Sequence, residues 1–159
     1  MSDDLIRRAP LVILLASVAV LGAAFAFQYL GGLAPCELCI AQRWPYAGTI
    51  ALAAVALVAP RAERPHLFLC AAIFAVGFGI AVYHVGVEQH WIAGPEACTG
   101  GPSGAATIEE LRRRLEATQM VRCDEPAWTL FGVSMAGYNA LVSIALAAFS
   151  LAAALRKKS

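Results

Sequence analysis

The chain has 159 residues, of which 60% are hydrophobic and 14% are charged, and its mean hydropathy is +0.67. An ordinary soluble domain carries about 25% charged residues, so this composition excludes such a domain and indicates a membrane protein. The formal net charge of +1 gives no basis for binding nucleic acid.

Four apolar segments follow one another along the chain. Pro10 to Leu30 holds 21 uncharged residues, which is about 31 Å of helix and enough to cross a bilayer. The second segment reaches that length only if its helix begins near Leu38 and takes in Arg43. We therefore predict an all-α membrane protein, a four-transmembrane-helix bundle forming a single domain over residues 1–159. The expected spans are 10–30, 38–59, 67–87 and 130–154, with loops at 31–37 and 88–129.

Four spans place both termini on the same side of the membrane, and charge selects that side. The termini and the 61–64 turn hold seven basic and three acidic residues, whereas the other two loops, counted together with Arg43, hold five basic and eight acidic ones. Basic residues accumulate in cytoplasmic loops. We therefore expect cytoplasmic termini, with the 31–37 and 88–129 loops on the outer side.

A Cys-x-x-Cys pair, Cys36 and Cys39, lies in the first outer loop, in the run Pro-Cys-Glu-Leu-Cys-Ile-Ala-Gln-Arg. Such a pair closes into a small reducible disulfide ring. Arg43 follows Cys39 by four residues, so on a helix the two share a face and the guanidinium favours the thiolate. A structural disulfide is poorly motivated because so short a ring adds little stability. The alternative for Arg43 is an arginine that snorkels to the interface.

Cys98 and Cys123 form a second pair in the 88–129 loop. They fit either an ordinary loop cross-link or a bond that exchanges with the first pair. Their spacing of 25 does not match a zinc knuckle. Between them, Thr107 and Glu110 form a capping box that predicts a short amphipathic helix, which we expect to lie on the bilayer surface. Cys70 falls within a span and is interpreted as a small buried apolar residue.

His84 and four aromatic residues complete the candidates. His84 lies near the outer end of the third span, where an ionisable group is a functional candidate and the alternative is a histidine hydrogen-bonded within the bundle. The aromatic residues are most simply interfacial anchors, or else the walls around a ring-shaped ligand. They are Trp44, Tyr46, Trp91 and Trp128.

These features together resemble the bacterial disulfide bond formation protein B family. The resemblance rests on the 35–43 run, the run from Tyr83-His84 to Cys98, and Cys123 with Trp128 five residues later. The Cys-x-x-Cys precedes the spaced pair here, unlike the order in quinone-linked relatives of the vitamin K epoxide reductase type. The resemblance implies a multi-pass protein of the bacterial inner membrane with its active cysteines on the periplasmic side.

The resemblance also implies a reaction. A DsbA-like periplasmic thioredoxin-fold protein would attack a Cys98–Cys123 disulfide, and Cys123 would then exchange with Cys36. Cys39 would face a quinone, ubiquinone or menaquinone, with Arg43 stabilising its thiolate and with His84 and Trp128 near the ring. No metal is expected, and the partners would be this protein, the membrane quinone pool and the bilayer.

Two alternatives stay open from the residues alone. One is a membrane metal-binding protein that uses the outer cysteines, and the other is a structural membrane subunit with inert disulfides. The sequence also leaves open the resting disulfide pairing, which is either the two pairs above or a bond between the loops.

Overall fold

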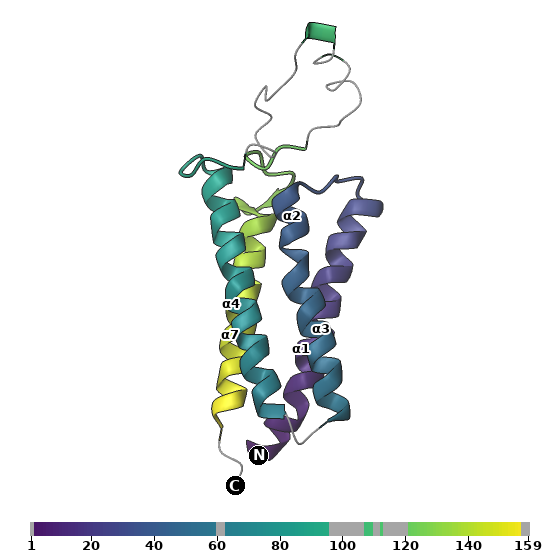
Figure 1. Ribbon diagram of the computed structural model, residues 1–159, viewed down its shortest axis with the longest axis vertical. Coiled ribbons are helices and arrows are strands. Elements are labelled where there is room, and N and C mark those ends of the chain that lie inside the picture. Colours follow the sequence, from purple (N-terminus) through teal and green to yellow (C-terminus); the bar gives the residue numbers. More distant parts are fainter. Residues whose placement is uncertain (1, 60–62, 96–106, 110–111, 113–120, 157–159) are drawn as a thin grey trace.

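The computed structural model describes residues 2–59, 63–95, 107–109, 112 and 121–156. Within them, four long helices run side by side along one axis, and a short helix and a hairpin lie at one end (Figure 1). The long helices are α1 (Ser2–Tyr29), α3 (Arg43–Val58), α4 (Glu63–Glu88) and α7 (Met135–Leu155). The short elements are α2 (Glu37–Ala41), β1 (Thr129–Leu130) and β2 (Val133–Ser134).

Three helices of the described residues are long and apolar enough to cross a membrane, namely Arg8–Tyr29, Arg64–Glu88 and Met135–Leu155. Large apolar side chains, such as Leu15 and Val76, are exposed on the outside of the bundle. A bundle that presents apolar side chains outward fits a hydrocarbon solvent better than water. The expected helical membrane protein is confirmed to this extent, and α3 as a fourth span stays a prediction.

The second predicted span is divided in the structure. One continuous helix was expected from Leu38, but α2 ends at Ala41 and α3 begins at Arg43, with Gln42 between them. Pro45 provides the physical reason, since it has no backbone N–H for the carbonyl of Ala41 and suits the first turn of a new helix.

The fourth predicted span also begins later than expected. Residues 129–134 form a hairpin in which Thr129 pairs with Ser134. Phe131 and Gly132 form its turn with φ values of 50° and 78°, and two positive φ angles match the twist of paired strands. The Ser134 side chain then caps α7 by accepting a hydrogen bond from the Gly137 N–H at 3.1 Å.

The core of the bundle is packed mainly by small residues. α4 packs along α7, and α1 along α3. A Cβ added at Gly77 would lie 3.1 Å from the Pro45 Cβ, so α3 and α4 approach closely, as small residues allow in membrane bundles. Cys70 is buried in this core, as expected. Tyr46 is only 2% exposed and lines an internal cavity, which fits its second interpretation, as a wall around a ligand, better than that of an interfacial anchor.

The two ends of the bundle differ in content. The start of α1 and the end of α7 lie at one end, whereas α2, the β1–β2 hairpin and the segment before it lie at the other (Figure 1). We call the latter the cysteine end, because Cys36, Cys39 and Cys123 belong to it. Cys98 and most of the predicted amphipathic helix at 107–115 lie outside the described residues.

Candidate functional site at the cysteine end

Cys36 and Cys39 form a dithiol at the start of α2. Cys36 is the N-cap of this helix, and its Sγ accepts a hydrogen bond from the backbone N–H of Cys39 at 3.2 Å. The Cys36 thiol in turn donates to the Cys39 Sγ, with 2.8 Å between the two sulfurs. Cys36 is buried and Cys39 is partly exposed. The pair is therefore already within reach of disulfide closure.

The two thiols have different proton affinities. The hydrogen bond from Cys36 lowers the pKa of Cys39 from 9.0 to about 7, and Arg43 adds a smaller effect in the same direction. Burial and the nearby Glu88 carboxylate oppose this fall in the pKa of Cys39. The same sulfur–sulfur hydrogen bond, together with burial, raises the pKa of Cys36. The hydrogen bond between the sulfurs therefore favours the thiolate form at Cys39 over that at Cys36.

Arg43 begins α3 and is held by α1. Its Nη1 donates to the Gln28 Oε1 at 2.6 Å, and its guanidinium carbon lies 4.9 Å from the centre of the Phe25 ring. A cation over an aromatic face is attracted by the ring quadrupole. Arg43 is thus fixed in place rather than extended into solvent, which argues against a purely snorkelling role.

A cavity of about 360 Å³ opens beside this dithiol and is lined mainly by apolar side chains of α1, of α7 and of the segments 33–36 and 121–130. Cys39, Arg43, His84 and Trp128 all line it. The Trp128 ring lies 5.4 Å from that of Phe27, centre to centre. An apolar cavity with a few polar groups on its wall is typical of a small-molecule site.

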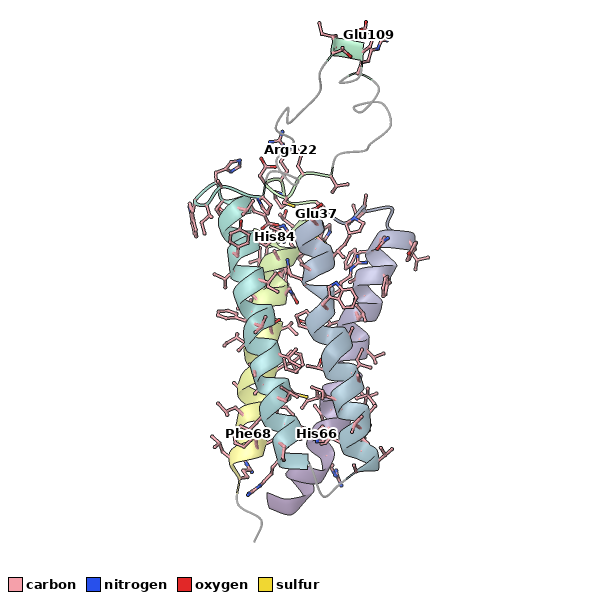
Figure 2. The ribbon with its side chains drawn as sticks, viewed as in Figure 1. Glu37, His66, Phe68, His84, Glu109 and Arg122 are labelled. Atoms are coloured by element: carbon pink, nitrogen blue, oxygen red, sulfur yellow. The ribbon has the colours of Figure 1, made fainter. Side chains whose placement is uncertain are left out.

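His84 is 3% exposed and lies behind the dithiol on α4. Its Nε2 is 3.7 Å from the Cys36 Sγ and 3.9 Å from a Glu88 carboxylate oxygen. Its Nδ1 lies 2.6 Å from the Gln42 side-chain nitrogen. Figure 2 places His84 near Glu37 and Arg122, at the opposite end of the bundle from His66 and Phe68. His84 therefore contacts the sulfur pair through Cys36.

Cys123 is disulfide-bonded, whereas Cys36, Cys39 and Cys70 are free. It is fully buried, in one cluster with Cys36, Leu38 and Val87. The structure thus packs one cysteine of the second outer loop onto the dithiol of the first.

The arrangement also bears on metal binding. Among the described residues, Cys36, Cys39 and His84 bring three potential ligand atoms within 4.8 Å of one another. Cysteine sulfur and histidine nitrogen are the ligands that zinc prefers, so the metal-binding alternative stays open.

Comparison with known proteins decides the family. A family model described as "Disulfide bond formation protein DsbB" matches residues 6–153. The chain belongs to the DsbB family. It is 32% identical over 148 residues to the disulfide bond formation protein B of Methylococcus capsulatus, covering 84% of each chain. To the protein of that name from Dechloromonas aromatica it is 25% identical, covering 90% of this chain and 88% of the relative.

A third relative carries no functional name. An uncharacterized protein of Rickettsia prowazekii is 27% identical over 142 residues, covering 87% of this chain and 82% of its own length. No solved structure matches the chain significantly. Membership of the DsbB family, with the membrane-spanning helices, places the chain among transmembrane oxidoreductases of disulfide bond formation.

Four polar residues of this DsbB-family site were missed from the sequence. Gln28 and Asn139 are uncharged polar residues inside apolar segments, a signal that could have marked them. Gln42 lies within the Cys-x-x-Cys run but draws no attention by its chemistry. Glu88 was counted as a loop charge, yet it is 8% exposed and accepts a hydrogen bond from Ser134.

Proposed function

We propose that this protein is a quinone-dependent protein-thiol oxidoreductase of the bacterial inner membrane. It would reoxidise a periplasmic thioredoxin-fold disulfide donor of the DsbA type and pass the electrons to membrane quinone. Family membership supports the disulfide chemistry, and the geometry of the cysteine end supports the choice of electron acceptor.

One observation carries the proposal: Cys39, the member of the dithiol whose pKa is lowered, lies on the wall of an apolar cavity beside a fixed arginine. A thiolate is the reactive form of cysteine. An apolar cavity next to it suits a lipid-soluble acceptor better than a water-soluble one. A structural subunit with inert disulfides does not explain why a sulfur with a lowered pKa would be placed there.

The cavity residues fit a quinone. Trp128 and Phe27 offer flat apolar surfaces, and Arg43 is a hydrogen-bond donor within the same cavity. Arg43 would hold a ring oxygen, while Cys39 would face the ring. A bound quinone would supply the capacity to take up two electrons and two protons.

The protein's own residues would act in sequence. The partner's thiolate attacks Cys98 of a Cys98–Cys123 disulfide, which releases Cys123 as a thiolate. Cys123 then attacks the Cys36 sulfur of an oxidised Cys36–Cys39 pair, and the electron pair of the broken bond leaves on Cys39. The partner's second thiol resolves the mixed disulfide and releases Cys98 as a thiolate. Cys98 then attacks Cys123 of the Cys36–Cys123 bond, which reforms the Cys98–Cys123 disulfide and leaves Cys36 reduced. The net result is one new disulfide in the partner and two electrons on the Cys36–Cys39 pair.

The topology is part of the same proposal. Gln42, which separates α2 from α3, keeps helical φ and ψ values of −67° and −15°. Residues 37–58 therefore continue along one helical path, which would extend about 33 Å and so reach across a bilayer. With α1, α4 and α7 this gives four spans in a single domain. The excess of basic residues near the termini and within residues 61–64 of the sequence supports cytoplasmic termini and a periplasmic cysteine end.

A turnover assay with purified protein tests the proposal. A reduced thioredoxin-fold dithiol protein and a soluble quinone are mixed with the membrane protein in detergent, and quinone absorbance is followed. We expect quinone reduction equal to the dithiol consumed. It should be lost in Cys39→Ser and kept in the control Cys70→Ser. Dithiol oxidation without quinone reduction would reject the acceptor, and stoichiometric bound metal with no turnover would favour the metal-binding alternative.

A further inference from the structure

Three atoms of the kind that bind metal ions meet at the cysteine end. The sulfurs of Cys36 and Cys39 and one ring nitrogen of His84 lie within 4.8 Å of one another. His84 Nε2 faces the pair, at 3.7 Å from the Cys36 Sγ. Two cysteine sulfurs and one histidine nitrogen are a ligand set that zinc proteins use. Cys39 and His84 both line the cavity, so a cation can reach these atoms from there.

The hydrogen bonds around these atoms suit metal ligands. The Cys36 Sγ accepts a hydrogen bond from the backbone N–H of Cys39 at 3.2 Å, and a donor at this place stabilises a sulfur that carries negative charge. The side-chain nitrogen of Gln42 lies 2.6 Å from His84 Nδ1. This contact fixes the plane of the ring and keeps Nε2 toward the sulfurs. Histidine ligands are normally held at their second nitrogen in this way.

The polar residues behind His84 can adapt to a bound cation. When Nε2 gives its lone pair to a metal, Nδ1 carries the proton and needs an acceptor. A half-turn of the Gln42 amide presents its oxygen to Nδ1, and the same half-turn at Asn139 keeps the hydrogen bond between the two amides. The Tyr46 hydroxyl lies 3.0 Å from the Ser143 hydroxyl and can then donate to it. Every group of this series therefore keeps a hydrogen-bond partner.

Charge and distance decide which redox state of the pair can bind a cation. Zn²⁺ with two thiolates has no net charge, so an apolar surrounding tolerates the complex better than a bare cation. A Glu88 carboxylate oxygen lies 3.9 Å from His84 Nε2 and can serve as a fourth ligand. The sulfurs of Cys36 and Cys39 lie 2.8 Å apart and would separate to about 3.7 Å on a tetrahedral zinc. A covalent bond between them forbids that movement, and a disulfide has no thiolate to offer.

We propose that the reduced Cys36–Cys39 pair and His84 form a redox-gated site for Zn²⁺, and that the bound cation keeps the pair from being oxidised. The cation is an inhibitor here and not a cofactor of the reaction. Binding releases the remaining thiol protons to solvent and transfers no electrons. It occupies the sulfur electron pairs that disulfide formation needs. The site stands on its own geometry, whereas inhibition of quinone reduction rests on the proposed function.

Zinc binding by purified protein in detergent tests the site. The variant with Cys98→Ser and Cys123→Ala lacks the second cysteine pair, so only the first pair can contribute. It is reduced, freed of reductant and metal, and titrated with Zn²⁺ against a chromophoric chelator, and its oxidised form is titrated in parallel. We expect one equivalent in the reduced form and none in the oxidised form. Co²⁺ should give sulfur-to-metal charge-transfer absorbance that added Zn²⁺ removes.

Matched histidine variants in the same background test the third ligand. Loss of a residue that only orients a ligand costs about tenfold or more in metal affinity, so we expect about a tenfold loss in Gln42→Met and about 100-fold or more in His84→Phe. His84→Gln keeps a polar side chain at that place and should show the same large loss as His84→Phe. His66→Phe, at the opposite end of the bundle (Figure 2), should bind as tightly as the parent. Equal affinities in the two phenylalanine variants would overturn the inference.

A single turnover without added dithiol measures the inhibition, since protein and small dithiols bind Zn²⁺ themselves. Reduced protein is mixed with a soluble quinone, with and without one equivalent of Zn²⁺. We expect oxidation about tenfold slower or less with Zn²⁺, because the thiolate is the reactive form, and full recovery when a chelator is added. Reduced protein that binds no Zn²⁺, equal binding by oxidised protein, or an unchanged rate with Zn²⁺ bound would overturn the inference. Metal-free protein that reduces no quinone would overturn the proposed function instead, while the titrations still decide the site.

Discussion

Removing the Cys36 thiol should change the reactivity of Cys39 in a way that depends on pH. The first cause of the low Cys39 pKa is the hydrogen bond from Cys36. Cys36→Ala deletes that donor, so the pKa of Cys39 should rise from about 7 toward the ordinary 9.0. Cys36→Ser keeps an O–H donor at the same place and should keep the pKa near its present value.

The size of the effect follows from ionisation and nucleophilicity together. At pH 7, a pKa of about 7 leaves half of Cys39 ionised, whereas a pKa near 9 leaves about 1%, a roughly fifty-fold loss of thiolate. A more basic thiolate is, however, more nucleophilic by about eightfold for such a shift, given a Brønsted coefficient of about 0.45. Cys36→Ala should thus be alkylated about sixfold more slowly than Cys36→Ser at pH 7 and about eightfold faster above pH 10.

The assay is the pH dependence of iodoacetamide labelling at Cys39, followed by peptide mass spectrometry. Both variants lack the neighbouring thiol, so Cys39 stays free without added reductant. The two rate profiles should cross between pH 7 and pH 10. Parallel profiles with the same midpoint would refute the reasoning and would leave Arg43 as the main source of the low pKa.

Three further predictions concern the arginine, the cap of α7 and the helix contact. Arg43→Met should raise the quinone KM by about tenfold, since it removes a charged donor held by Gln28. The KM of Arg43→Lys should lie between those of the wild type and Arg43→Met. Equal KM values in all three proteins would contradict a ligand role for Arg43. Ser134→Ala should lower the free energy of unfolding by about 2 kcal/mol, because it removes a helix cap and leaves a Glu88 oxygen unpaired. Ser134→Thr keeps the hydroxyl and should retain most of the wild-type stability. A denaturation titration in detergent measures both variants. Gly77→Ala should lower the free energy of unfolding by about 1–2 kcal/mol in the same titration, since its Cβ meets Pro45. Gly79→Ala, which has open space around it, should be neutral or stabilising. An equal loss of stability in the two variants would exclude the contact with Pro45 as the cause.

Much of the fold could be predicted because apolar length and charge are properties of single segments. The helices over 10–30 and 67–87 follow from runs of uncharged residues, and the structure confirms α1 and α4 as long apolar helices. The break at Gln42 and the hairpin at 129–134 could not be predicted this way. Both depend on local backbone hydrogen bonds, which hydropathy does not report.

The site was predictable only where chemistry and spacing coincide. Cys36 and Cys39 stand three residues apart and Arg43 follows Cys39 by four, and the structure places Cys39 and Arg43 on one cavity. Asn139 is 97 residues from Gln42, so their hydrogen bond depends on how α7 packs against the rest of the bundle. His84 was a candidate from its position, but its contact with Cys36 required the packing of α4 against α2.

The spectrum of the reduced protein with added quinone tests the central claim most directly. A Cys39 thiolate against a quinone ring should give a new long-wavelength absorbance band, which appears with a midpoint near the Cys39 pKa of about 7. The band should vanish in Cys39→Ser, weaken in Arg43→Met and persist in Cys70→Ser. A spectrum that is unchanged by quinone at every pH, from protein shown to be folded and reduced, would contradict the claim that an ionised sulfur faces a bound quinone.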